Sequence, residues 1–284
     1  MEHTATVLKS FALEGLAQGT AMALGEDAAW LRLADGSVAR VNRADGAFVT
    51  IPVGTGEFGS LAIGEGAVWV TTFDEDKLSR IDPATNTVVA EIEVGTNPEG
   101  IAVTPGAVWV SNHRGGSIWR IDPATNAVVA RIDAGQPGPS GPKDLQLAFG
   151  DIWTTVPNSS IVIRVDPETN EVATIDVVTV EALVVGDQSL YVTDALAKIS
   201  EIDPESNTAI RRFYPDAVPW IFGDGSFWSV DGSDLLRLDT ASFATTETWH
   251  IPGEQNDYFG FSFVGDSIWL LTNVGLLLEV QLSS

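Results

Sequence analysis

An internal repeat constrains this chain more than any other feature. The seven residues RIDPATN occur at 80–86 and again, letter for letter, at 120–126. A longer repeat is marked by an aromatic residue that follows a Gly/Asp turn and one or two small or apolar residues. These aromatic residues are 37 to 44 residues apart, close to the ~40–45 residues of a four-stranded propeller blade. They are Trp30, Trp69, Trp109, Trp153, Tyr191, Trp228 and Trp269.

Each of these seven units contains four short runs rich in β-branched and aromatic residues, separated by turn signals. In the third unit we expect strands a to d at 100–103, 107–112, 117–121 and 127–135. The repeated DPATN lies between strands c and d. There Asp, Pro and Asn are favoured because they cap the turn, preset φ and tolerate a left-handed conformation. The duplicated motif is therefore interpreted as turn chemistry and not as a catalytic signature.

The two ends of the chain complete one another. The seventh unit stops after its strand c, and the N-terminal text TATVLKSFALEG aligns with the strand-d text TNTVVAEIEVG of 85–95. We expect residues of about 4–14 to form the outer strand of the last blade, because radial repetition requires the first and last blades to be joined. The prediction is an all-β, seven-bladed β-propeller of four-stranded antiparallel blades, with residues 1–284 as a single domain.

The charge and hydropathy of the chain limit the kinds of partner it can bind. The chain has 15 Lys and Arg against 39 Asp and Glu, a net charge of −24, and its basic residues are scattered. Such a surface repels phosphate backbones, so a nucleic-acid partner is not expected. No run of ~18 apolar residues predicts a membrane span. No signal peptide is visible, so the default expectation is a cytoplasmic monomer, or a secreted or periplasmic protein if a leader was removed.

The stretch VWVSNHRGGSIWRIDPATNAVVARIDAG, residues 108–135, resembles the YVTN or YncE-like propeller repeat. The resemblance is strong over 60–135 and persists more weakly elsewhere. Members of that family are mostly seven-bladed propellers that serve as binding or surface proteins, often without known chemistry. The streptogramin (virginiamycin B) lyases share the repeat and do carry out chemistry.

The lyase pattern can be compared position by position. It places a Glu three residues after the blade aromatic and a His ten residues before it. At the first set of positions only Asp194 and Asp231 carry a carboxylate. The second set holds no histidine, so a lyase of the same mechanism is disfavoured. Its residues are Thr20, Gly59, Glu99, Lys143, Glu181, Val218 and Phe259.

Propeller topology brings the d–a and b–c connections together on one face, around the mouth of the central channel. The sharpest feature there is a Glu99–Lys143–Glu181 series at equivalent places in three successive blades. Such a series is expected to perturb the pKa values of its members and to bind a zwitterionic or polyhydroxylated ligand. The alternative is a ring of ion pairs in which these residues pair with one another and bind no ligand. Further candidate ligand-binding residues on this face are Asn112, His113, Arg114, Asp194, Asp231 and Tyr258.

Three of these residues are candidates for catalysis: His113, Lys143 and Glu181. A histidine can act as a general base or a metal ligand near neutral pH, although HRGG equally fits a solvent-facing turn. Metal binding would rest on carboxylates, since cysteine is absent. Asp194 and Asp231, with Glu181, are the candidates for a hard cation such as Mg²⁺ or Ca²⁺.

Two functions remain open from the sequence. The leading hypothesis is a non-catalytic scaffold that binds a small polar ligand or a protein partner at the channel mouth. The alternative is a lyase or hydrolase of the streptogramin-lyase-like type, dependent on carboxylates and Lys143, with or without a divalent metal, acting on a lactone, ester or sugar-like substrate.

Overall fold

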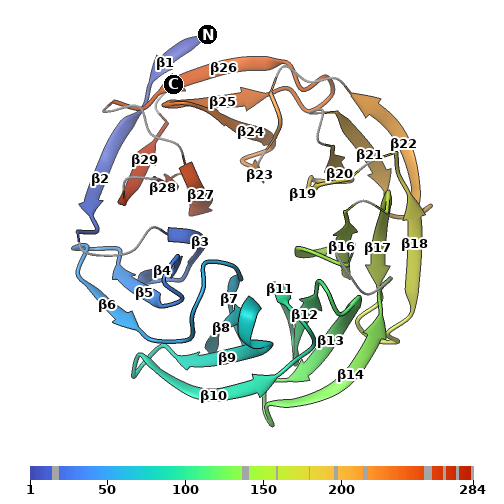
Figure 1. The fold of residues 1–284 in the computed structure, drawn as a ribbon. Helices are drawn as coiled ribbons and strands as arrows, with labels where there is room; N and C mark the ends of the chain where they lie inside the picture. The colour runs from blue at the N-terminus through green and yellow to red at the C-terminus, as the bar shows by residue number, and fades with distance from the viewer. Residues whose placement is uncertain are drawn as a thin grey trace.

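A computed structural model shows seven β-sheets arranged around a ring, and one short 3-10 turn, η1 (Phe73–Glu75), among the described residues (Figure 1). The described residues are 1–14, 19–135, 141–157, 159–178, 180–194, 198–213, 217–219, 221–252, 258–264, 267–272 and 275–282, without the side chains of 19–20, 258–260 and 264. The predicted seven-bladed, all-β propeller is confirmed.

The blades are built from antiparallel strands in chain order, with the first strand nearest the channel, and the N-terminal residues 2–12 depart from this order. The first four blades are β3 (Gly19–Leu24), β4 (Ala28–Leu33), β5 (Val38–Asn42) and β6 (Phe48–Ile51); β7 (Leu61–Gly64), β8 (Ala67–Thr72), β9 (Lys77–Asp82) and β10 (Thr87–Glu93); β11 (Pro98–Thr104), β12 (Ala107–Asn112), β13 (Ser117–Asp122) and β14 (Ala127–Asp133); and β15 (Leu145–Ala148), β16 (Asp151–Val156), β17 (Ile161–Val165) and β18 (Val172–Asp176).

The remaining blades follow the same order, and the last takes its outer strand from the N-terminus. They are β19 (Ala182–Val185), β20 (Leu190–Thr193), β21 (Ile199–Asp203) and β22 (Thr208–Phe213); β23 (Ile221–Gly223), β24 (Ser226–Asp231), β25 (Asp234–Leu238) and β26 (Thr245–His250); and β27 (Tyr258–Val264), β28 (Ser267–Thr272), β29 (Leu276–Gln281) and β2 (Thr6–Ala12).

The N-terminal strand closes the ring as predicted. β2 pairs antiparallel with β29, from Thr6 opposite Gln281 to Ala12 opposite Leu276. A salt bridge of 2.8 Å between Lys9 and Glu279 reinforces the pairing. The first and last segments of the chain therefore share one blade.

The residues before β2 add a strand that the sequence did not predict. β1 (Glu2–Thr4) pairs in parallel with β26, with His3 opposite Trp249, so the sixth blade has a fifth strand. The imidazole of His3 stacks on the Trp249 indole at 5.2 Å between centroids. The N-terminal segment thus spans two blades, with β1 on the sixth and β2 on the seventh.

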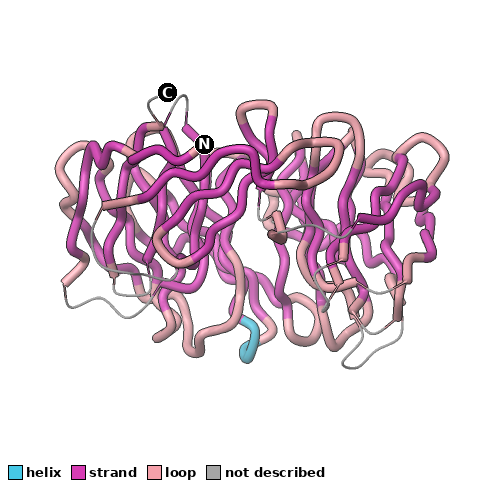
Figure 2. Tube along the Cα trace, turned by 90° about the horizontal axis from the view of Figure 1, so that it is seen from above, coloured by secondary structure: helices cyan, strands magenta, loops and turns pink. Residues whose placement is uncertain are grey.

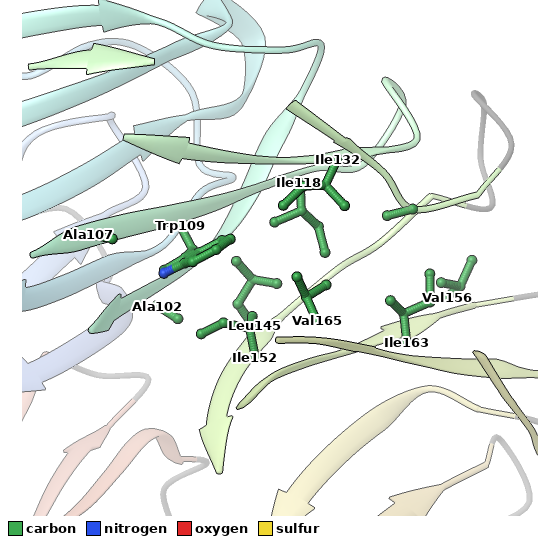
Figure 3. Close-up of a cluster of buried hydrophobic side chains, with 11 residues drawn as sticks. Ala102, Ala107, Trp109, Ile118, Ile132, Leu145, Ile152, Val156, Ile163 and Val165 are labelled. Atoms are coloured by element: carbon green, nitrogen blue, oxygen red, sulfur yellow. The ribbon is translucent and has the colours of Figure 1, made fainter. Parts of the chain in front are cut away.

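The hydrophobic core lies between neighbouring blades. Figure 3 shows one such layer, in which Trp109 of the third blade lies near Leu145 and Ile152 of the fourth. Trp109 is fully buried, and its indole N–H donates to Thr104 Oγ1 at 3.0 Å. Burying a large flat side chain between two sheets accounts for the aromatic residue that recurs in each unit. No helix within the described residues is long and apolar enough to cross a membrane.

We predict unequal effects when the two N-terminal strands are removed. Deleting residues 1–4 removes a short parallel pairing and should lower the free energy of unfolding by about 1–3 kcal/mol, given about 1 kcal/mol for each hydrogen bond. Deleting residues 1–12 also removes β2 and should cause a far larger loss of stability. Thermal unfolding followed by tryptophan fluorescence measures both effects. Equal melting temperatures for the longer deletion and the parent would contradict a role for β2 in closure.

Candidate functional site

The d–a crossovers and b–c turns lie on the same face of the propeller. In Figure 2, η1, which belongs to the b–c turn of the second blade, marks this face at the lower edge. The described candidate residues from the third and fourth blades gather here. Glu99 lies in β11, His113 follows β12, and Lys143 and Asp144 precede β15.

Glu99 is the centre of the candidate site. One carboxylate oxygen lies 3.8 Å from Lys143 Nζ, and the other lies 3.9 Å from His113 Nδ1. The Glu99 side chain is 25% exposed and that of Lys143 is 40% exposed, so both can be reached from solvent. Three side chains from three segments therefore converge, as the sequence predicted for Glu99 and Lys143.

His113 is held by the backbone of two crossovers. Its backbone N–H donates to Asn97 O at 2.9 Å, and its Nδ1 lies 3.1 Å from Gly141 O. Because a carbonyl can only accept, this contact requires the proton on Nδ1 and leaves Nε2 as the free acceptor. Gly141 packs so closely on His113 O that any Cβ at position 141 would overlap it. The turn containing His113 is therefore a fixed part of the site.

The carboxyl groups here have unusual proton affinities. Burial raises the pKa of Glu99, and the neighbouring charge of Asp144 raises it further, against the opposing effects of Lys143 and His113. The surface of Asp144 is exposed, yet protein atoms packed around its carboxyl group raise its pKa by desolvation, partly offset by Lys143. Two acids with raised pKa values beside an ammonium group can bind an ammonium ligand or exchange a proton.

Other predicted site residues have different surroundings. Asn112 is fully buried, with its side-chain amide 3.4 Å from Ser117 O, so it supports the turn from within. Glu181 and Arg114 are exposed, and among the described residues neither forms an ion pair. In particular, Lys143 pairs with Glu99 but not with Glu181. The side chain of Tyr258 lies outside the described residues.

The two carboxylates considered for a metal do not form a shared site. Asp194 is buried and bonded to Arg212 at 2.9 Å and to the backbone N–H of Lys198 at 2.9 Å. Asp231 is exposed at the end of β24 in the next blade. Within the described part of the chain, no three His, Cys, Asp or Glu side chains group in a way that would hold a metal ion. A Mg²⁺ or Ca²⁺ site at Asp194, Asp231 and Glu181 is therefore not assembled here.

Asp144 is the site residue that the sequence interpretation missed. It lies nine residues before the blade aromatic, where most other units have a small residue, such as Ser60, Gly100 and Ala182. A carboxylate at this position departs from the repeat, and this departure could have identified Asp144 as a site residue from the sequence. Gly141 was also missed, because its role depends on contact with another blade.

Comparison with solved structures identifies proteins that share this fold. No family model and no curated protein sequence matches the chain. The chain is similar to virginiamycin B lyase from Staphylococcus aureus, with a TM-score of 0.80, 18% identity and coverage of 97% of this chain and 99% of that chain. The chain has the fold of a streptogramin B lyase.

Two further structures give the same result. A catalytically inactive histidine-to-alanine variant of the Staphylococcus aureus lyase with quinupristin has a TM-score of 0.79 at 18% identity, covering 97% of this chain and 99% of that chain. A streptogramin B lyase has a TM-score of 0.78 at 16% identity, covering 97% of each chain. At these identities the likeness establishes the fold alone.

The raised pKa of Asp144 predicts the pH dependence of stability. The folded protein holds this proton at pH values where the unfolded chain has released it. The free energy of unfolding therefore falls as the pH rises from the ordinary Asp pKa through the raised value. Asp144→Asn should melt at a higher temperature than the parent at about pH 8, and this advantage should vanish at about pH 3. Asp231→Asn, which makes the same change of charge at an exposed carboxylate two blades away, is the control, and an equal gain there would contradict this explanation.

Proposed function

We propose that this propeller is a non-catalytic scaffold that binds a small zwitterionic molecule at the channel mouth. The convergence of Glu99, Lys143 and His113, with Asp144 beside them, carries the proposal. A ligand ammonium would pair with the Glu99 and Asp144 carboxylates, and a ligand carboxylate with Lys143. Exposed Arg114 lies one residue from His113 and offers a second, bidentate partner for an anionic group.

Binding explains these residues better than covalent catalysis does. Ser111 is the hydroxyl next to this cluster in the sequence, but it is fully buried and bonded to Lys143 O, so it is not available as a nucleophile. The positions that match the lyase histidine hold Glu99 and Lys143 in these two blades. What the site offers is a set of fixed, complementary charges.

One observation favours the enzymatic alternative. Glu99, with its raised pKa, lies 3.9 Å from His113, and an acid–base pair of this kind can move a proton during cleavage of a lactone, ester or sugar-like substrate. The shared fold with streptogramin B lyases is compatible with that reaction class. A protein partner at the same face is the third possibility.

A thermal-shift screen with amino acids, betaines and monosaccharides, with and without Mg²⁺ or Ca²⁺, tests the proposal. A ligand at about 100 times its Kd stabilises a protein by about 2.7 kcal/mol, which gives a readily measured shift. Glu99→Gln and Lys143→Ala should abolish the shift, whereas Asp231→Asn should retain it. Glu181→Gln determines whether the ligand extends to the fifth blade.

The binding should also depend on pH in a defined direction. Protonation of Glu99 removes the charge that holds the ligand ammonium, so affinity should fall as the pH drops through its raised pKa. Isothermal titration at several pH values measures this dependence.

The thermal-shift screen has outcomes that would contradict the proposal. A thermal shift that survives both Glu99→Gln and Lys143→Ala would place the ligand elsewhere. Absence of a shift with every compound would favour a protein partner, and product formation from an ester or lactone, detected by mass spectrometry, would favour the enzyme.

A further inference from the structure

A buried hydroxyl connects the third and fourth blades directly beneath the candidate site. Ser111, in β12, is fully buried. Its Oγ accepts the backbone N–H of Gly100 at 2.7 Å and donates to Lys143 O of the next blade. Gly100 follows Glu99, so a single hydroxyl joins the backbone beside Glu99 to the backbone of Lys143.

Thr71 makes the same bridge in the second blade, and Thr155 makes its donating half in the fourth. Thr71 Oγ1 accepts the N–H of Ser60 at 2.8 Å and donates to Glu99 O at 3.0 Å. Thr155 Oγ1 donates to Glu181 O at 3.5 Å. Each donor lies two residues after a blade aromatic, and each acceptor lies ten residues before the next one. These hydroxyls hold the backbone of the three residues in the Glu99–Lys143–Glu181 series.

The first blade has an arginine at this position and makes a related connection. Arg32, also fully buried, donates from Nη2 to Gly56 O at 3.2 Å and to Phe58 O at 3.4 Å, both in the crossover to the second blade. Arginine in place of serine or threonine thus also joins strand b to the crossover that leads to the next blade. The position two residues after the aromatic therefore connects strand b to the next crossover in four successive blades.

The inner strands of the third and fourth blades approach closely at Gly100. A Cβ at Gly100 would lie 2.6 Å from both Lys143 O and Leu145 N, so only glycine lets these inner strands approach so far. This approach brings Glu99 within 3.8 Å of Lys143, and it brings Gly141 against His113. Loss of the bridge would remove one of two hydrogen bonds that hold the backbone of Lys143, the other running from Lys143 N–H to Thr155 O at 3.1 Å.

We infer that Ser111 is a positioning residue of the channel mouth, whose hydroxyl fixes the crossover carrying Lys143 and Asp144 against the segments carrying Glu99 and His113. The geometric part of this inference stands without the proposed ligand. Its consequence for affinity rests on the proposed function.

The tautomer of His113 reports the geometry directly. The contact with Gly141 O and the Glu99 carboxylate oxygen 3.9 Å from Nδ1 both select the Nδ1–H form of the neutral ring. Long-range ¹H–¹⁵N NMR spectra above the histidine titration range distinguish the two tautomers. The chain has only three histidines, and His250, whose Nδ1 lies 2.9 Å from Asp234, serves as an internal reference in a distant blade.

Ser111→Ala should shift His113 toward the Nε2–H form and leave His250 unchanged. Ser111→Thr should restore the parent spectrum, since threonine fills this position in the second and fourth blades. Thr155→Val removes the next bridge along and should leave His113 unaffected. If Ser111→Ala fails to fold, Ser111→Cys, which keeps the side-chain shape with a larger γ atom and weakens the hydrogen bond, replaces it.

An unchanged His113 tautomer in Ser111→Ala, or in Ser111→Cys where that variant replaces it, would overturn the inference. An equal change in Thr155→Val would also overturn it, because the effect would then be general loosening. For a compound that binds in the thermal-shift screen, Ser111→Ala should raise Kd about tenfold, the factor expected from one lost hydrogen bond. A tautomer shift without any change in Kd would retain Ser111 as a positioning residue and reject the mouth as the ligand site.

Discussion

The burial of one large aromatic side chain between neighbouring blades is the interaction on which the rest of the structure depends. Trp69, Trp153 and Trp228 are almost completely buried, and each donates its indole N–H to the carbonyl five residues earlier, at 2.9–3.1 Å. An arginine from strand c covers the ring, as Arg80 covers Trp69 at 5.2 Å. Each tryptophan thus links its own strands and fills the wedge beside the next blade, which fixes blade spacing and therefore the position of every crossover.

Two blades have an acidic residue at the strand-c position and take the basic residue from strand d, and in the seventh blade that strand d is the N-terminal one. In the fifth blade, Glu201 replaces the strand-c arginine, and Arg211 from strand d pairs with it at 2.8 Å. In the seventh blade, Glu279 holds the strand-c position and Lys9 supplies the base from strand d, with its Nζ 5.6 Å from the Trp269 ring centroid. Because Lys9 belongs to β2, closure supplies a cation as well as backbone pairing. The N-terminal strand therefore completes the sheet and adds a second cation near Trp269, whose ring centroid also lies 4.8 Å from the Arg43 guanidinium.

The fold could be predicted because its determinants repeat, whereas contacts between blades could not. Aromatic spacing gave the number of blades, and strand-d text at the N-terminus gave the closure. β1 was missed because Glu2–Thr4 has no strand pattern of its own and pairs with a distant edge. Equivalent spacing correctly placed Glu99 beside Lys143 but also suggested Glu181. Gly100 lets the third and fourth blades come close enough for Glu99 to reach Lys143. The equivalent residue of the fourth blade is Asp144, whose side chain leaves less room for the fifth blade. Spacing also cannot give side-chain direction, so Asn112, a candidate ligand-binding residue from the sequence, is buried in the structure.

The candidate site occurs where the repeat is broken. Ser60 and Ala182 show that a small residue satisfies the fold at the position of Asp144, and Phe73 occupies the position equivalent to His113. A carboxylate with a raised pKa beside another such carboxylate destabilises the folded protein at neutral pH. Residues that break a local rule at a cost in stability are expected at functional positions. Two carboxylates with raised pKa values lower the folding stability of the free protein, and Lys143 offsets only part of that loss. A ligand ammonium between Glu99 and Asp144 would offset the remainder.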